Sequence, residues 1–211
     1  MMYGALPQDL GRVDVPTDEM MFWLYCPIKT PEAAFVYLPD NLAQFTPILQ
    51  AVKNDDHDRF EQSFVYLTAK TLWASQECVG NRPGWHSDGF GTDDLNYIWY
   101  DRAPTVFVRG AFELPSDCEG SMQRMAELAF LCDKVTYPDR HLLRLDQTVV
   151  HRSPDDFKAG MRTFVKVSIS SERYNLLGNS INHNLPESWP LVARQASRNH
   201  PVSPPPDSPY T

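Results

Sequence analysis

The chain has 211 residues, 42% of them hydrophobic and 22% charged, and a formal net charge of −8. This size and composition predict one globular domain, and the negative charge argues against non-specific binding along a nucleic-acid backbone. The sequence shows no long apolar span and no signal peptide, and its four cysteines lack the Cys-x-x-Cys spacing. We therefore expect a protein with no membrane partner, located in a reducing cytoplasm.

The first part of the chain predicts strands and one supporting helix. Residues 1–17 form an irregular lead-in, and residues 20–26 are a short apolar run typical of a buried strand, with residues 33–38 as its partner. Apolar residues at helical spacing predict a helix over residues 40–52, packed on the outside of a sheet. Residues 54–58 are acidic and predict a solvated turn. Residues 63–73 are rich in β-branched and aromatic side chains and predict a strand, whose polar face (Thr68, Lys70) lines either a pocket or an exposed edge.

The next stretch, residues 84–91, reads Gly-Trp-His-Ser-Asp-Gly-Phe-Gly and contains a candidate metal-binding motif. On an extended segment, His86 and Asp88 project to the same side. A second histidine, His151, ends an apolar, β-branched run further along the chain, and His141 competes with it as a ligand. Two imidazoles and one carboxylate leave coordination positions open, which is the arrangement of a non-haem Fe(II) centre.

Between these motifs the sequence predicts further strands and a helix. Residues 96–100 alternate aromatic side chains, with Tyr97 on one face and Ile98 on the other. The face that looks into the fold would bring Asn96 or Tyr97 to a cofactor or substrate, although aromatic core packing is the more frequent role. Residues 105–109, 141–145 and 147–151 predict strands, and a stripe of Met and Leu from residue 121 to residue 132 predicts a helix.

A last strand is predicted over residues 162–170, where alternation separates two faces. Thr163, Val165, Val167 and Ile169 form an aliphatic face that should pack against helices. Arg162 then points into the cavity, where its planar guanidinium would suit a carboxylate.

In these motifs the chain resembles the 2-oxoglutarate-dependent Fe(II) oxygenases, over about residues 82–170. The resemblance implies a mainly β fold with flanking helices (α+β), built on a double-stranded β-helix, also called a jelly-roll or cupin-like core. It implies His86, Asp88 and His151 as Fe(II) ligands and Arg162 as the residue that binds the far carboxylate of 2-oxoglutarate. Many relatives carry Ser or Thr two residues after this arginine, whereas this chain has Phe164.

The function implied by the resemblance is hydroxylation of a substrate, with O2 consumed and 2-oxoglutarate decarboxylated to succinate. The acidic composition favours a small molecule or a peptide as substrate over a nucleobase. Two alternatives stay open: a cupin-like metalloenzyme that does not use 2-oxoglutarate, and a non-catalytic β-barrel binding module. Arg82, Arg102, Arg109 and Arg152 lie near the motifs and form either an anion-binding rim or ordinary solvated charges.

The domain expected from these features covers residues 1–185, with the motif-bearing core at about residues 63–171. Prolines accumulate over residues 186–211, which predicts an extended C-terminal tail. The sequence gives no prediction of the oligomeric state.

Overall fold

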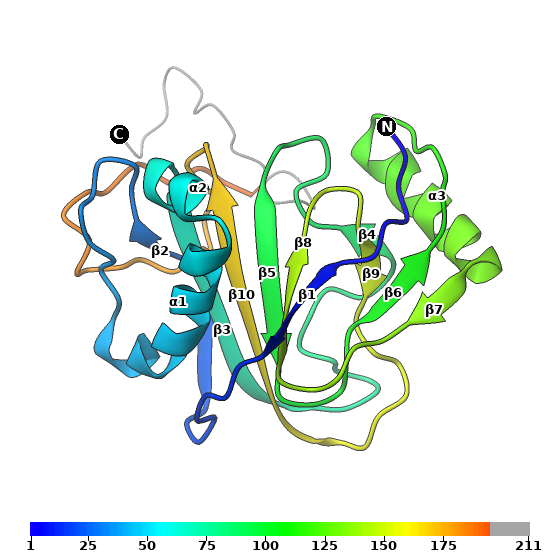
Figure 1. Ribbon diagram of the computed structural model, residues 1–211, viewed down its shortest axis with the longest axis horizontal. Coiled ribbons are helices and arrows are strands. Elements are labelled where there is room, and N and C mark those ends of the chain that lie inside the picture. Colours follow the sequence, from blue (N-terminus) through cyan, green and yellow to red (C-terminus); the bar gives the residue numbers. More distant parts are fainter. Residues whose placement is uncertain (195–211) are drawn as a thin grey trace.

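The computed structural model describes residues 1–194, which form a mainly β protein with two antiparallel sheets and few helices (Figure 1). The strands are β1 (Gln8–Arg12), β2 (Met21–Lys29), β3 (Phe64–Ala74), β4 (His86–Ser87), β5 (Leu95–Tyr100), β6 (Val106–Arg109), β7 (Asp133–Val135), β8 (His141–Leu145), β9 (Val150–Arg152) and β10 (Gly160–Ser170). The helices are the 3-10 helix η1 (Asp40–Phe45) and the α-helices α1 (Thr46–Asp55), α2 (His57–Gln62) and α3 (Cys118–Leu131). The mainly β fold predicted from the sequence is confirmed.

The strands of the described chain form two sheets, each with a defined strand order. The larger sheet has the order β1-β8-β5-β10-β3-β2, and the smaller sheet has the order β4-β9-β6-β7. β10 lies inside the larger sheet, because it pairs with β3 on one side and β5 on the other. From β3 onward the chain passes repeatedly between the sheets, so strands distant in sequence become neighbours.

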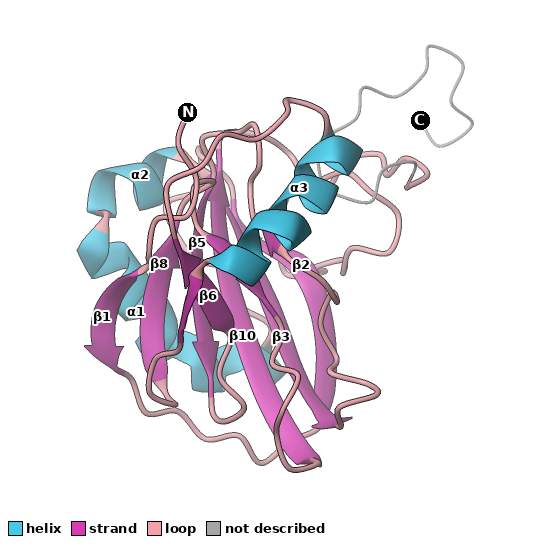
Figure 2. Cartoon of the chain, turned by 90° about the vertical axis from the view of Figure 1, so that its right-hand side faces the viewer, coloured by secondary structure: helices cyan, strands magenta, loops and turns pink. Residues whose placement is uncertain are grey.

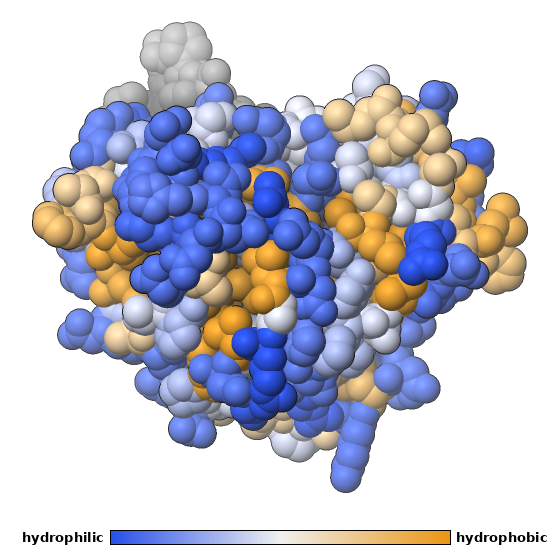
Figure 3. Space-filling view, in the orientation of Figure 1, coloured by the Kyte–Doolittle hydropathy of each residue, from blue (hydrophilic) through white to orange (hydrophobic). Residues whose placement is uncertain are grey.

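Helices cover the outer faces of the sheets (Figures 1 and 2). The apolar side of α1 (Ile48, Leu49, Val52) is buried against the larger sheet, together with the aliphatic face of β10. The opposite side of α1 faces solvent, and hydrophilic side chains cover the neighbouring helix α2 (Figure 3). On the smaller sheet, Met125 and Ala129 of α3 share a buried cluster with strand residues, in the same way.

A third apolar cluster contains residues from both sheets. Ile98 and Leu143 of the larger sheet share it with Phe107 of the smaller sheet, and Phe164 of β10 packs against it. Apolar side chains of both sheets therefore fill one part of the space between the sheets. The rest of that space is lined by polar side chains and is available for a functional site.

Three element predictions need correction. Residues 33–38 form no strand; the segment is an irregular loop in which Tyr37 N–H donates to the Ile28 carbonyl. The expected irregular lead-in contains β1, which pairs with β8. The acidic segment expected to be a turn instead holds the end of α1 and the start of α2, where the Asp56 carboxylate accepts a hydrogen bond from the Arg59 N–H.

Part of the expected tail can be located. Val192 forms a parallel bridge with Leu176, and the Trp189 ring packs edge-on against Phe64. The remainder of the Pro-rich segment, residues 195–211, lies outside the described residues. Within residues 1–194, no helix has both the length and the apolar character that crossing a bilayer requires.

Candidate metal centre

The two sheets bring the predicted ligand residues together. His86 on β4 and His151 on β9 face each other as register partners in the smaller sheet, and Asp88 follows β4 directly. One candidate ligand atom from each of the three residues lies within 4.8 Å of the others. The motif and the distant histidine therefore form one group of potential metal ligands.

Hydrogen bonds fix the tautomer of both histidines. Nδ1 of His86 lies 2.9 Å from the Gly84 carbonyl oxygen, and Nδ1 of His151 lies 3.2 Å from the Val149 carbonyl oxygen. A carbonyl can only accept, so each Nδ1 carries the proton and each Nε2 keeps its lone pair. Ligating histidines are commonly oriented by such a bond from the other ring nitrogen.

Burial keeps the two rings neutral. His86 and His151 are only 9% and 5% exposed. Burial, followed by the neighbouring His151, lowers the pKa of His86 to about 3, and burial lowers the pKa of His151. Metal ions bind the neutral imidazole, so neither ring needs to lose a proton at neutral pH.

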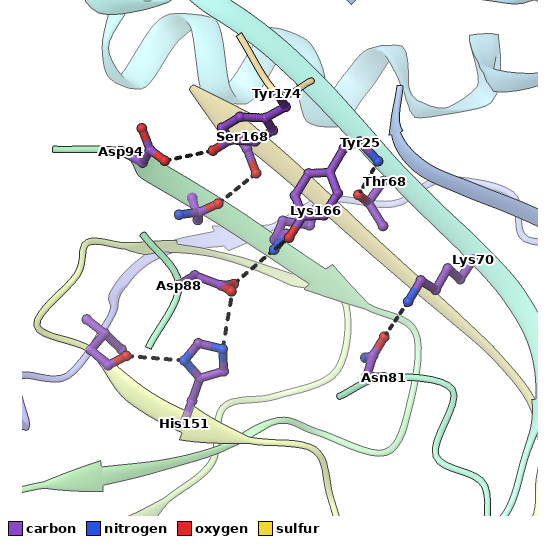
Figure 4. A network of polar contacts seen from close by, with 12 residues as sticks. Tyr25, Thr68, Lys70, Asn81, Asp88, Asp94, His151, Lys166, Ser168 and Tyr174 are labelled. Carbon is purple, nitrogen blue, oxygen red and sulfur yellow. Dashed lines mark hydrogen bonds and ion pairs between the residues drawn. The ribbon is translucent and has the colours of Figure 1, made fainter. Parts of the chain in front are cut away.

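The carboxylate of the group is paired with a buried lysine (Figure 4). Lys166 Nζ lies 3.2 Å from Asp88 Oδ2 and donates a 2.9 Å hydrogen bond to the Tyr25 hydroxyl oxygen. Burial alone would raise the pKa of Asp88, but the charge of Lys166 holds it well below its usual range. Asp88 is therefore an anion, already oriented beside the two rings.

Tyr25 holds this lysine from a strained position. Its backbone φ is 47°, a left-handed conformation that costs energy for a residue with a side chain, and it lies where the pairing of β2 with β3 is irregular. Its N–H donates to Thr68 Oγ1. The sequence motifs gave no signal for Tyr25, because its contact with Lys166 depends on how the sheets fold together.

A cavity of about 230 Å³ opens beside the three ligand residues. The polar face predicted for β3 lines it, because Thr68 and Lys70 are both on its wall. Burial, and then the charges of Lys166 and Arg162, lower the pKa of Lys70 to about 8. Its Nζ contacts Gly80 O and Asn81 Oδ1 at 3.2 and 3.4 Å, both uncharged groups.

Arg162 does not line this cavity, which corrects the expectation that its side chain points into it. It lines a separate space of about 10 Å³, and Lys70, Asn81 and Phe164 line both spaces. Its Nε donates to the backbone carbonyls of Arg102 and Ala103 at 3.1 and 3.2 Å. Arg162 is 4% exposed, and its Nη2 is buried with no hydrogen-bond partner. A buried guanidinium nitrogen without an acceptor leaves capacity for an anion.

The two cofactor contacts expected on β5 separate onto opposite faces. Asn96 lines the cavity, and its Oδ1 accepts a 2.7 Å hydrogen bond from the Ser168 hydroxyl. Tyr97 points to the helix side, where its hydroxyl donates to Asp55 Oδ2 at 2.8 Å. Tyr97 therefore does not line the cavity, which corrects the expectation for this residue; adjacent residues of a strand face opposite ways.

The competing histidine is placed elsewhere. His141 lies on β8, and its Nδ1 is 3.0 Å from the carboxylate of Asp9 on β1. It is not part of the His86, Asp88 and His151 group.

No family model and no curated protein matches this chain. Fold and site together define a mainly β protein with a candidate His–Asp–His metal centre.

Proposed function

We propose that the protein is an Fe(II)- and 2-oxoglutarate-dependent oxygenase that hydroxylates its substrate. The observation that carries this proposal is the group of two buried histidines with free Nε2 lone pairs and one partly buried carboxylate beside a cavity. Such a donor set occupies one side of a metal ion and leaves positions open for a cosubstrate and oxygen.

The path of the chain supports a double-stranded β-helix for strands β3 to β10. Within these eight strands, β3, β5, β8 and β10 belong to the larger sheet and the other four to the smaller sheet. Two facing four-stranded sheets with repeated crossings between them are typical of an eight-stranded jelly-roll. In this scheme His86 lies on the second strand and His151 on the seventh, and these two strands pair directly.

The chain's own residues would prepare the site. His86, Asp88 and His151 would hold the iron, which when bound would activate O2, with 2-oxoglutarate and the substrate each supplying two electrons. Lys166 orients the Asp88 carboxylate through their ion pair. Arg162, whose Nη2 has no partner, would reach the far carboxylate of 2-oxoglutarate once the Asn81 and Phe164 side chains that separate it from the cavity move aside, and Lys70, which lines both spaces, would add a second positive charge. Asn81 and Phe164 form the wall between Arg162 and the cavity. Phe164 occupies the position at which many relatives of the oxygenase family carry Ser or Thr.

The proposal is tested without a substrate. Fe(II) and then 2-oxoglutarate are added to the protein without oxygen, and the visible metal-to-ligand charge-transfer band is recorded. We expect the band in the native chain and its loss in His151→Ala. His141→Ala is the matched control and should keep the band, because His141 is bonded to Asp9 away from the cavity. Iron binding without the band would favour the cupin-like alternative, and the absence of both would favour a binding module.

The cosubstrate contact has its own test. Arg162→Met should weaken 2-oxoglutarate binding by about tenfold or more, the loss expected for a charged hydrogen bond, and leave iron affinity unchanged. Lys70→Met measures the contribution of the second cation. Equal 2-oxoglutarate affinity in Arg162→Met would remove the role assigned to Arg162 while leaving the metal centre in place.

A further inference from the structure

The cavity beside the metal centre is lined by more positive than negative side chains. The basic residues on its wall are Lys70, Arg82, Arg152, Lys166 and Arg194, and the acidic residues are Asp88 and Asp94. The whole chain has the opposite balance, with 27 acidic and 19 basic residues. A cleft lined by one sign of charge concentrates ligands of the other sign, even on a protein of opposite net charge.

Some of these charges are already neutralised inside the protein. Lys166 is paired with Asp88, and Arg152 forms a 2.5 Å ion pair with Asp155 and stacks over the Trp85 ring. Within residues 1–194 Asp94 is not paired with a cation in this way; its carboxylate accepts a hydrogen bond from the neutral Tyr174 hydroxyl at 2.7 Å.

Two guanidinium groups at the cavity lack a carboxylate partner within residues 1–194. Arg82 Nη2 contacts the Met122 sulfur at 2.7 Å, and a thioether is a weak acceptor. Arg194 Nη2 donates to Asn179 Oδ1 at 3.0 Å, a neutral amide. Each guanidinium carries five N–H donors in a fork that suits carboxylate and phosphate oxygens, so both retain most of their capacity.

From this distribution we propose, building on the oxygenase function above, that the substrate is a small anionic molecule whose carboxylate or phosphate group binds Arg82 and Arg194. Arg162 and Lys70 would neutralise the far carboxylate of 2-oxoglutarate, and the metal would neutralise the charge of its oxo-acid end. Arg82 and Arg194 therefore remain for the substrate. The cavity of about 230 Å³ sets a small size. A neighbouring cavity of about 120 Å³ shares Tyr25 and Tyr174 with it and contains Asn179, the partner of Arg194, which gives room for an apolar substrate body.

The test titrates two simple anions into protein loaded with redox-inert Zn(II) and 2-oxoglutarate. Inorganic phosphate and acetate are added in separate arms at constant ionic strength, and binding heat is measured by calorimetry. We expect saturable binding of at least one anion, about tenfold weaker in Arg82→Gln and in Arg194→Gln. The arm with the tighter binding identifies the anionic group. Arg109→Gln is the matched control, because Arg109 lies on β6 and is exposed; it should bind as the native chain does.

The outcomes separate this proposal from the one on which it rests. Unchanged anion affinity in both arginine variants, or anions that only displace 2-oxoglutarate, would overturn the substrate assignment. If 2-oxoglutarate does not bind but anion affinity still depends on Arg82 and Arg194, the anion site is supported and the oxygenase function fails. Unchanged Zn(II) affinity and an unchanged circular dichroism spectrum in each variant verify that its metal centre and fold are intact.

Discussion

The two faces of β10 show how one strand serves both stability and chemistry. On the helix side, Val165, Val167 and Ile169 are fully buried in a hydrophobic cluster with α1. On the cavity side, Lys166 and Ser168 are almost as deeply buried, but each has a polar partner. Burying a charge is costly unless it is paired. The helix-side face therefore contributes hydrophobic burial, whereas each polar residue on the other face depends on its partner.

The substitution expected to distinguish the two faces of β10 most clearly is Lys166→Met. Without this lysine, the Asp88 carboxylate of the metal-free protein has lost its cation, and we expect the free energy of unfolding to fall by about 3 kcal/mol. Saturating Zn(II) should reduce this fall in the free energy of unfolding, because the bound ion replaces the missing positive charge beside Asp88. Urea unfolding with and without Zn(II) measures both values, with the exposed Lys134→Met as control. An equal loss in both conditions would mean that Lys166 has no link to the metal site.

On the other face, Val167→Ala should destabilise the protein by about 2 kcal/mol, since it removes buried methyl groups from a packed cluster. Metal affinity should stay as in the native chain. A drop in Zn(II) affinity comparable to that of a ligand variant would show that the two faces are not independent.

The pH dependence of stability should come from the cavity side. The pKa of His86 is lowered from 6.5 to about 3 in the folded protein, so between these values the unfolded chain binds more protons. The free energy of unfolding of the metal-free protein should therefore fall as the pH falls below 6.5, by up to about 1.4 kcal/mol per pH unit from this residue. His86→Asn should make the slope shallower in urea unfolding at pH 7, 6 and 5; an unchanged slope would contradict the burial of a neutral ring.

The smallest effect is expected for Ser168→Ala. It removes the hydrogen bond to Asn96 Oδ1 and should cost about 1 kcal/mol, or about 2–4 °C in melting temperature. Thermal denaturation followed by circular dichroism measures the shift. A shift as large as that of Val167→Ala would indicate a wider polar network.

The sequence predicted those parts of the site that depend on local spacing. His86 and Asp88 are two residues apart on an extended segment, and the alternation along residues 162–170 separated the apolar from the polar face. On β5, however, both faces are aromatic, so the pattern could not show that Tyr97 points to the helices.

Contacts between distant strands were beyond sequence reasoning. The Lys166 pair with Asp88 and Tyr25 joins three segments far apart in the chain, and no local pattern encodes which side chains meet across the sheets. The false strand at residues 33–38 has a similar cause: its composition suits a strand, but the segment forms no ladder with a neighbour, and Phe35 is 72% exposed.

The position of β10 also has a consequence for synthesis on the ribosome. It is the last strand of the described chain, yet it lies between β3 and β5, which were made much earlier. Until residue 170 has left the exit tunnel, those two strands have unpaired edges open to mispairing with other nascent chains. Lys166, the cation that pairs with Asp88, is therefore added last, after all three candidate ligand residues have been made.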